Sequence, residues 1–164
     1  NNFDKRPFNK PAPDLILGLT STMYIGNLDL SFTVRGAVGN YVYNNVASTT
    51  GYYNRLNELT PNNMTASVLE SNFKAPQYFS DYYIEDGSFA RLDNLTLGYT
   101  INASKKFNLR LYATGQNLLL LTKYTGLDPE IGNISNSNSS PRFGIDDNIY
   151  PRARAFLFGV NINL

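Results

Sequence analysis

The sequence contains no cysteine and no histidine among its 164 residues. Without cysteine there is no disulfide framework, no thiolate metal site and no cysteine nucleophile. Without histidine the chain lacks the residue that most often acts as a general base or a metal ligand near neutral pH. Serine is frequent, but none stands in a Gly-x-Ser-x-Gly elbow. We therefore expect no catalytic residue, no metal site and no cofactor.

Charged residues are also few, at 16% of the chain against about 25% in typical globular proteins. The net charge is +1, so no strong basic field indicates a nucleic-acid partner. No apolar run reaches the roughly 18 residues that would predict a transmembrane helix. These absences leave a weakly charged chain whose apolar residues are distributed in short stretches.

Aromatic residues are abundant, at 13% of the chain, with twelve tyrosines and ten phenylalanines. Several segments alternate apolar and polar residues with the period of two that strands require. In the clearest, every second residue from Leu28 to Val34 is apolar and the residues between them are polar. The five segments are about 14–24, 27–43, 89–101, 106 onward and 152–164. This pattern predicts an all-β, antiparallel structure.

Charged residues are absent from the central span of the apolar face of each segment. Asp29, Arg35 and Arg110 lie on the polar faces of their strands. In a transmembrane barrel the apolar faces contact lipid, where a cation would cost about 2–4 kcal/mol at the midplane, and the polar faces line the lumen. Half-buried strands of a soluble β-sandwich have the same alternation. The strand pattern alone therefore does not distinguish a membrane barrel from a soluble sandwich.

The connections between the segments are more informative, because short and long ones alternate. The first connection is a tight turn at Gly26 and Asn27, and the third spans only 102–106. The other two are long, at 44–88 and 122–150. Outer-membrane barrels have short periplasmic turns and long extracellular loops, whereas loops of this length are unusual inside a compact domain. We expect 44–88 and 122–150 to be extracellular loops.

Five strands are too few to close a barrel in lipid, because an open edge would leave backbone groups unpaired. The chain is therefore expected to be part of a larger barrel. Barrels of this kind must be exported, and the chain opens without an apolar targeting segment. We accordingly expect the N-terminus of the protein to lie outside it. Tyrosines near strand ends fit an interfacial girdle, although tyrosine also favours strands in general.

Four stretches in order along the chain resemble a known family. They are EDGSFARLDNLTLGY at 85–99, LRLYATGQNL at 109–118, YTGLDPE at 124–130 and YPRARAFLFGVN at 150–161. In these stretches the chain resembles the SusC-like (RagA-like) TonB-dependent transporters of the Gram-negative outer membrane. The resemblance extends over 14–164 and is strongest from residue 80 onward.

The resemblance implies a multi-pass outer-membrane β-barrel of about 22 strands with a plug in its lumen. Residues 1–164 would supply the five C-terminal strands, and the plug and earlier strands would lie outside this chain. The implied function is import of an oligosaccharide or a peptide, driven through TonB, which contacts a segment outside this chain. The implied partners are a SusD-like surface lipoprotein that acts as a lid and a second transporter–lipoprotein pair in a dimer.

The last strand resembles the signal that barrel-assembly machinery reads. The resemblance assigns this role to Phe156, Phe158, Gly159, Ile162 and Leu164. The family usually ends in phenylalanine, so the leucine at the last position is a departure. Either leucine is tolerated there, or the signal continues beyond this chain.

Tyrosines in the first long loop are candidates for contact with a ligand or with the lid. They are Tyr52, Tyr53, Tyr78 and Tyr82. Flat aromatic rings stack on ligands and bury amphipathic area at low conformational cost. The alternative is that they pack the loop onto itself. In the same loop, 53–59 is expected to form a short helix that ends before Pro61, and 85–87 a turn before the third strand.

Arg35 and Arg110 are candidates for lumen-facing charges. They would contact the plug, an anionic ligand or the neighbouring strands. Three other functions remain as alternatives. A passive porin or barrel-anchored adhesin would lack the plug, and a soluble carbohydrate-binding β-sandwich would dissolve without detergent. An outer-membrane hydrolase is disfavoured by the absence of histidine.

Overall fold

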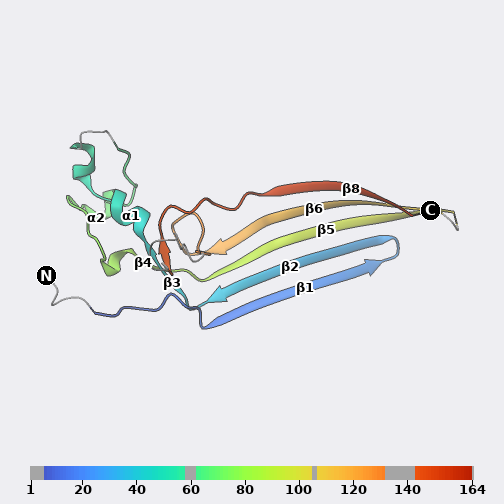
Figure 1. The fold of residues 1–164 in the computed structure, drawn as a ribbon, viewed down its shortest axis with the longest axis horizontal. Helices are drawn as coiled ribbons and strands as arrows, with labels where there is room; N and C mark the ends of the chain where they lie inside the picture. The colour runs from blue at the N-terminus through green and yellow to red at the C-terminus, as the bar shows by residue number, and fades with distance from the viewer. Residues whose placement is uncertain (1–5, 58–61, 105–106, 132–142, 164) are drawn as a thin grey trace, which may run out of the picture. The chain divides into compact units, whose positions relative to one another are not determined.

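The computed structural model describes residues 6–57, 62–104, 107–131 and 143–163 (Figure 1). The chain divides into two compact units. Unit 1 comprises the described residues within Asn1–Asp14, Gly39–Ser88 and Lys123–Pro151, and unit 2 comprises those within Leu15–Val38, Phe89–Thr122 and Arg152–Leu164. Among the described residues, no helix is both long and apolar enough to cross a membrane.

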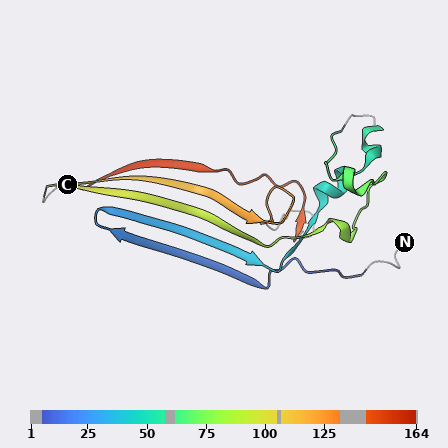
Figure 2. The same cartoon turned by 180° about the vertical axis from the view of Figure 1, so that it is seen from behind.

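Unit 2 is one antiparallel sheet of five strands in the order β1-β2-β5-β6-β8 (Figures 1 and 2). Its strands are neighbours in the order in which they follow along the chain, as in the wall of an up-and-down barrel. The strands are β1 (Leu15–Ile25), β2 (Leu28–Val38), β5 (Phe89–Ser104), β6 (Phe107–Thr122) and β8 (Ala155–Asn163).

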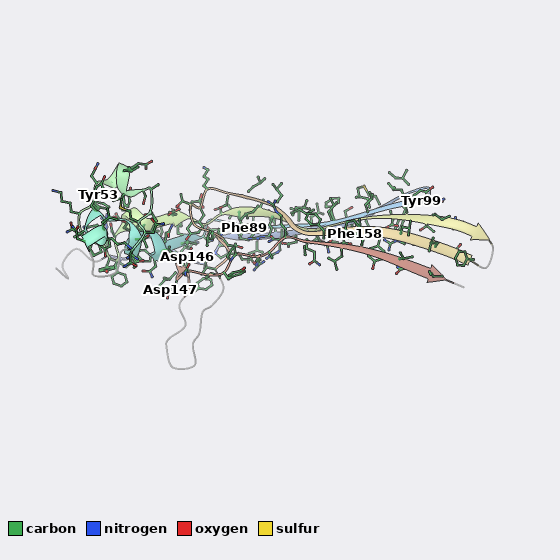
Figure 3. The ribbon with its side chains drawn as sticks, turned by 90° about the horizontal axis from the view of Figure 1, so that it is seen from above. Tyr53, Phe89, Tyr99, Asp146, Asp147 and Phe158 are labelled. Carbon is green, nitrogen blue, oxygen red and sulfur yellow. The ribbon has the colours of Figure 1, made fainter. Side chains whose placement is uncertain are left out.

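The register places most of the apolar residues of the five strands on one face of this sheet. One row across the sheet reads Met23, Leu30, Leu97, Ala113 and Phe158, each paired with the next. Most large side chains of this face are exposed in the chain (Figure 3). Because the face is continuous and uncharged along the middle of the strands, it matches the lipid-facing surface of a transmembrane barrel.

The opposite face of the sheet is mostly polar. The adjacent row reads Thr22, Ser31, Thr96 and Thr114 and ends at the apolar Leu157 on β8. Hydroxyls connect neighbouring strands along this row, with 3.2 Å between the Thr22 and Ser31 oxygens and 2.8 Å between those of Thr96 and Thr114. Cross-strand pairs of this kind stabilise a sheet by a few tenths of a kcal/mol to about 1 kcal/mol each.

The second predicted strand, 27–43, is wrong at its end. β2 stops at Val38, and Tyr41–Asn44 forms a separate strand, β3, in a different sheet. The break lies at Gly39, whose φ of 86° side chains rarely adopt. A Cβ at Gly39 would also overlap the carboxylate of Asp14. The backbone therefore turns at Gly39 even though the alternation of apolar residues continues past it.

Unit 1 is built on a small sheet in the order β4-β3-β7. β3 (Tyr41–Asn44) pairs antiparallel with β4 (Ile84–Asp86) and parallel with β7 (Ile145–Asp146). The three strands come from separate parts of the chain, and β7 lies in the second long loop. The two long loops predicted from the sequence are thus joined by backbone pairing.

Short helices complete unit 1: α1 (Asn45–Thr50), α2 (Val68–Ser71) and the 3-10 helices η2 (Tyr53–Asn57) and η3 (Asp81–Tyr83). Within the helix predicted at 53–59, Tyr53–Asn57 forms a 3-10 helix, and residues 58–61, including Pro61, lie outside the described residues. Of the turn predicted at 85–87, Glu85 and Asp86 belong to β4, and only Gly87 lies between β4 and β5. Asp86 Oδ1 accepts the Ser88 amide at 2.9 Å.

Candidate functional site

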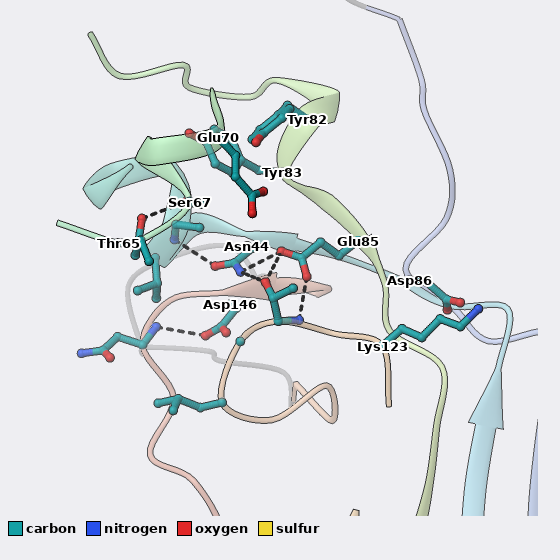
Figure 4. Close-up of a pocket in the computed structure, with 17 residues that line it drawn as sticks. Asn44, Thr65, Ser67, Glu70, Tyr82, Tyr83, Glu85, Asp86, Lys123 and Asp146 are labelled. Carbon is teal, nitrogen blue, oxygen red and sulfur yellow. Dashed lines mark hydrogen bonds between the residues drawn. The ribbon is translucent and has the colours of Figure 1, made fainter. Parts of the chain in front are cut away.

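A cavity of about 720 Å³ lies within unit 1 and is lined by residues of both long loops (Figure 4). Binding cavities of this size hold small molecules or parts of larger ones. The wall residues discussed below are Asn44, Glu70, Tyr82, Tyr83, Glu85, Asp86, Lys123, Thr125 and Asp146. The short strands β3, β4 and β7 position Asn44, Glu85 and Asp146 respectively.

The carboxylate of Glu85 holds the two loops together at the cavity wall (Figure 4). Its Oε1 accepts Asn44 Nδ2 at 2.9 Å and Thr125 Oγ1 at 2.8 Å, and its Oε2 accepts the Thr125 amide at 2.7 Å. Hydrogen bonds to an ionised acceptor are worth about 1.5–3 kcal/mol each. Glu85 therefore fixes the start of the second loop against the sheet of the first.

Asn44 extends this network into helix α1. Its Oδ1 accepts the Ala47 amide at 2.9 Å, which makes Asn44 the N-cap of α1. Since its Nδ2 donates to Glu85, one side chain links helix, strand and loop. Asn44 therefore both caps helix α1 and hydrogen-bonds the carboxylate of Glu85.

A second link between the loops is the hydrogen bond from the Tyr124 hydroxyl to Asp146 Oδ2, at 2.5 Å. Both side chains are buried. Burial, followed by this hydrogen bond and the negative charge of Asp146, raises the pKa of Tyr124 well above its ordinary value. Asp146 Oδ1 also accepts the Asn148 amide at 3.2 Å, so both of its oxygens are used.

Aromatic rings form another part of the cavity wall. Tyr82 and Tyr83 contact each other edge to face, with 5.0 Å between centroids, and Phe73 meets Tyr82 at 5.2 Å. Tyr83 is buried, and this burial is the main cause that raises the pKa of its hydroxyl. Tyr82 is half exposed and presents its ring at the opening.

The charges around the cavity are mostly negative. Glu70, Glu85, Asp86 and Asp146 contribute carboxylates, against one ammonium from Lys123. The hydroxyl and amide of Ser88 are the main causes that lower the pKa of Asp86, and the charge of Lys123 adds to them. The wall therefore offers hydrogen-bond acceptors beside an aromatic ring. Among the described residues no group of three or more possible ligands is arranged to hold a metal ion.

The structure separates the four tyrosines proposed as ligand or lid contacts. Tyr82 lines the cavity, and Tyr78 is 58% exposed but does not line it. Tyr53 begins η2 (labelled in Figure 3) and is partly buried. Tyr52 is only 7% exposed, so its ring packs inside unit 1. Of the four, Tyr82 and Tyr78 are the rings that an incoming molecule reaches most easily.

The two arginines singled out in the sequence lie on the polar face of unit 2, where each forms an ion pair with a residue of another strand. Arg35 on β2 forms an ion pair with Asp93 on β5. Arg110 on β6 binds Asp29 on β2 through two hydrogen bonds, of 2.9 Å and 2.5 Å. This second pair spans the intervening strand β5.

Gly98 on β5 lies beneath that ion pair. A Cβ there would lie 2.5 Å from Asp29 Oδ2 and 2.6 Å from Arg110 Nη2, closer than real Cβ contacts. In this geometry the pair lies over a residue without a side chain, and a Cβ there would push one of the two partners aside. Gly159 on β8 has a comparable role, since a Cβ there would overlap the ring of Tyr112.

The residues assigned to the assembly signal lie on β8, except for the last. Phe156, Phe158 and Ile162 alternate along one face and are exposed, whereas Gly159 lies on the opposite face. Leu164 lies outside the described residues. Apolar and polar residues alternate over the described part of β8 except at Leu157, and the role of these residues in assembly stays a prediction.

Sequence reasoning did not identify the linking network of Asn44, Glu85, Thr125, Tyr124 and Asp146. The sequence predicts a turn at Glu85 and gives no role to Asp146, which lies in the second long loop. The available signal was the concentration of polar residues at the edges of both long loops. That signal does not tell which of them meet.

No family model matches the chain. Among curated proteins, it is 39% identical to the TonB-dependent receptor SusC of Bacteroides thetaiotaomicron over 97% of the chain. It is 32% identical to the TonB-dependent receptor P3 of Formosa agariphila, also over 97% of the chain. The chain spans only 16% and 17% of the lengths of these two relatives.

Solved structures give the same result for the fold. The chain matches a chain of the RagAB peptide importer in its open-open state with a TM-score of 0.69 at 23% identity, over 97% of this chain and 18% of that one. The closed-closed state matches with a TM-score of 0.69 at 22% identity, over 96% of this chain and 18% of that one. These relatives are receptors and importers rather than enzymes, and their barrels lie in the outer membrane. The chain is therefore a barrel segment of a SusC/RagA-like TonB-dependent receptor of the outer membrane.

Proposed function

We propose that the receptor containing this segment imports a large nutrient, an oligosaccharide or a peptide, across the outer membrane. Import is energised through TonB, and a SusD-like lipoprotein closes the barrel from outside. The observation that carries this proposal is the 39% identity to SusC along 97% of the chain. The fold match to a structure named as a peptide importer is the reason to keep peptides among the candidate substrates.

In this proposal the two units have different tasks. The sheet of unit 2 is part of the barrel wall, with its Leu and Phe face toward lipid and its Thr and Ser face toward the lumen. The loops 44–88 and 122–150 of unit 1 face the cell exterior, and the short turns face the periplasm. Support comes from the alternation of short and long connections, which is the rule in outer-membrane barrels. The cavity of unit 1 then lies where substrate or lipoprotein first meets the receptor.

The test uses the complete receptor in its native host. Uptake of labelled oligosaccharides and labelled peptides is measured in wild-type and receptor-deletion cells, with and without a protonophore. We expect one substrate class to depend on the receptor, and its uptake to stop when the proton gradient collapses. Receptor-dependent uptake that continues without the gradient would instead identify a passive porin. Co-purification of a lipoprotein with the detergent-extracted receptor tests the lid.

A further inference from the structure

Strand pairing in unit 2 is irregular at one level, close to the strand ends that lead into the long loops. The register between β2 and β5 omits Asp93, and the register between β5 and β6 omits Asp93, Asn117 and Leu118. Bulges of this kind leave residues out of the ladder and bend the strand. The ladder of the sheet is therefore interrupted shortly before the chain enters the loops.

Side chains connect the strands at the level where the ladder is interrupted. Arg35 on β2 forms an ion pair with Asp93 on β5. Arg91 on β5 is only 2% exposed, and its Nη1 donates to Asn117 Oδ1 on β6 at 2.7 Å. Asn117 Nδ2 in turn donates to the carbonyl of Arg152 at 2.7 Å. Because Arg91 is buried by residues of this segment alone, its contact with Asn117 does not require the rest of the barrel.

Asn117 lies just beyond the last ladder pair between β6 and β8. That pair joins Gln116 to Ala155. The carbonyls that accept from Asn117 Nδ2 belong to Arg152 and, at 3.4 Å, to Ala153. Arg152 is the residue at which the chain re-enters unit 2 after the second long loop. One side chain therefore fastens the point where that loop rejoins the barrel wall.

The position of Asn117 makes three demands, and asparagine meets all of them. Its φ is 54°, in the left-handed region, which asparagine tolerates better than most residues. Its oxygen must accept from Arg91, which can only donate, and its nitrogen must donate to carbonyls, which can only accept. Glycine would adopt the backbone without the side chain, and aspartate would accept without donating.

We propose that Asn117 is the anchor that keeps β8 in register with β6 when the second long loop moves. The anchor acts on the barrel wall and requires neither substrate nor lipoprotein, so it goes beyond the proposed import function. A displacement of the loop reaches β8 through residues 152–154. With the anchor in place it stops at Arg152, and without the anchor the ladder opens locally from Ala155 onward.

The experiment measures hydrogen–deuterium exchange in the full-length receptor, extracted in detergent together with any bound lipoprotein. Exchange over 155–158, at the loop end of β8, is compared with exchange over 159–163, at its far end. Asn117→Gly keeps the left-handed backbone without the amide, and Asn117→Asp keeps an acceptor for Arg91 without the donor. Asn108→Gly is the matched control, because Asn108 lies on the same strand and takes part in none of these contacts. The heat-sensitive shift on a gel reports whether each barrel assembles.

Exchange over 155–158 is expected to be about tenfold faster in Asn117→Gly and in Asn117→Asp, because both lose the hydrogen bonds donated to the loop end. Exchange over 159–163 should keep the wild-type rate, and both barrels should assemble. Asn108→Gly should leave exchange over 155–158 unchanged.

Unchanged exchange over 155–158 in both Asn117 variants overturns the anchor. Faster exchange in Asn117→Gly alone also overturns it, since the donated hydrogen bonds would then not matter. Equal acceleration over 155–158 and 159–163 does the same, because Asn117 would then support the general stability of the wall. If neither variant assembles, Asn117 is needed to build the wall, and its role as an anchor against loop movement is likewise refuted.

Discussion

At the scale of single residues, the absence of a side chain at Gly98 decides how charge is arranged on the polar face of the barrel wall. The Asp29–Arg110 pair reaches across β5 through the space that Gly98 leaves open above that strand. Arg110 also lies over the ring of Tyr112, 5.0 Å from its centroid. The side chains of Asp29 and Arg110 thus occupy the space that a side chain at position 98 would fill.

Gly98→Ala is expected to destabilise the folded receptor by about 1–3 kcal/mol, because the added methyl group displaces one partner of a charged hydrogen-bonded pair. The melting temperature of the purified receptor measures this effect. In an Asp29→Ala background the same substitution should cost less, since the carboxylate that it displaces is gone. Strictly additive effects in this double-mutant cycle would show that Gly98 acts independently of the pair.

At the scale of elements, alternation assigns each residue of a strand to lipid or to lumen. Leu97 and Thr96 are adjacent in the middle of β5 and belong to opposite faces. Leu97→Lys is expected to cost about 2–4 kcal/mol and to lower the amount of assembled barrel. Thr96→Lys should leave assembly near wild type, because its ammonium stays in water. The heat-sensitive shift of folded receptor on a gel measures assembly, and equal losses for both variants would contradict the assignment.

The strands of unit 2 were predictable to within a few residues because each carries its own alternating pattern. β3 was not, because the pattern runs on past Gly39 while the backbone turns away. The full length of β5 was also missed: it continues to Ser104, beyond the last clear apolar position near Ile101. The alternating pattern identifies the two faces of a strand, but it does not show where the chain passes from one sheet to another.

At the scale of the whole molecule, the two units have separate stabilising contacts. Glu85→Ala is expected to loosen the two loops while the sheet of unit 2 remains folded, because it removes the acceptor of three hydrogen bonds within unit 1. Protease cleavage within 62–88 and 122–131 on intact cells should become roughly tenfold faster. Glu70→Ala is the control, since Glu70 lines the same cavity without taking part in these bonds. Cleavage unchanged by Glu85→Ala would mean that other contacts hold the loops.

The cavity could be anticipated only in part. The aromatic content of the first loop pointed to Tyr82, which lines the cavity, but also to Tyr52, which is buried. The pairings of Glu85 with Thr125 and of Tyr124 with Asp146 join residues from different parts of the chain. In the sequence, nothing distinguishes these four residues from the other polar residues of the loops. The sequence gives the order of the residues along the chain, but which of these side chains meet depends on the folded structure.

The parallel pairing of β3 with β7 has a consequence for how such receptors diversify. Tyr43 lies beside Ile145 and Asn44 beside Asp146, so the backbone of one long loop is the template for the other. A recombination that imported only one loop from a relative would bring in a strand without its matching edge. Sequence changes in the two loops should therefore be inherited as a set. Grafting a new specificity onto this barrel calls for transplanting 39–88 and 123–151 as one cassette.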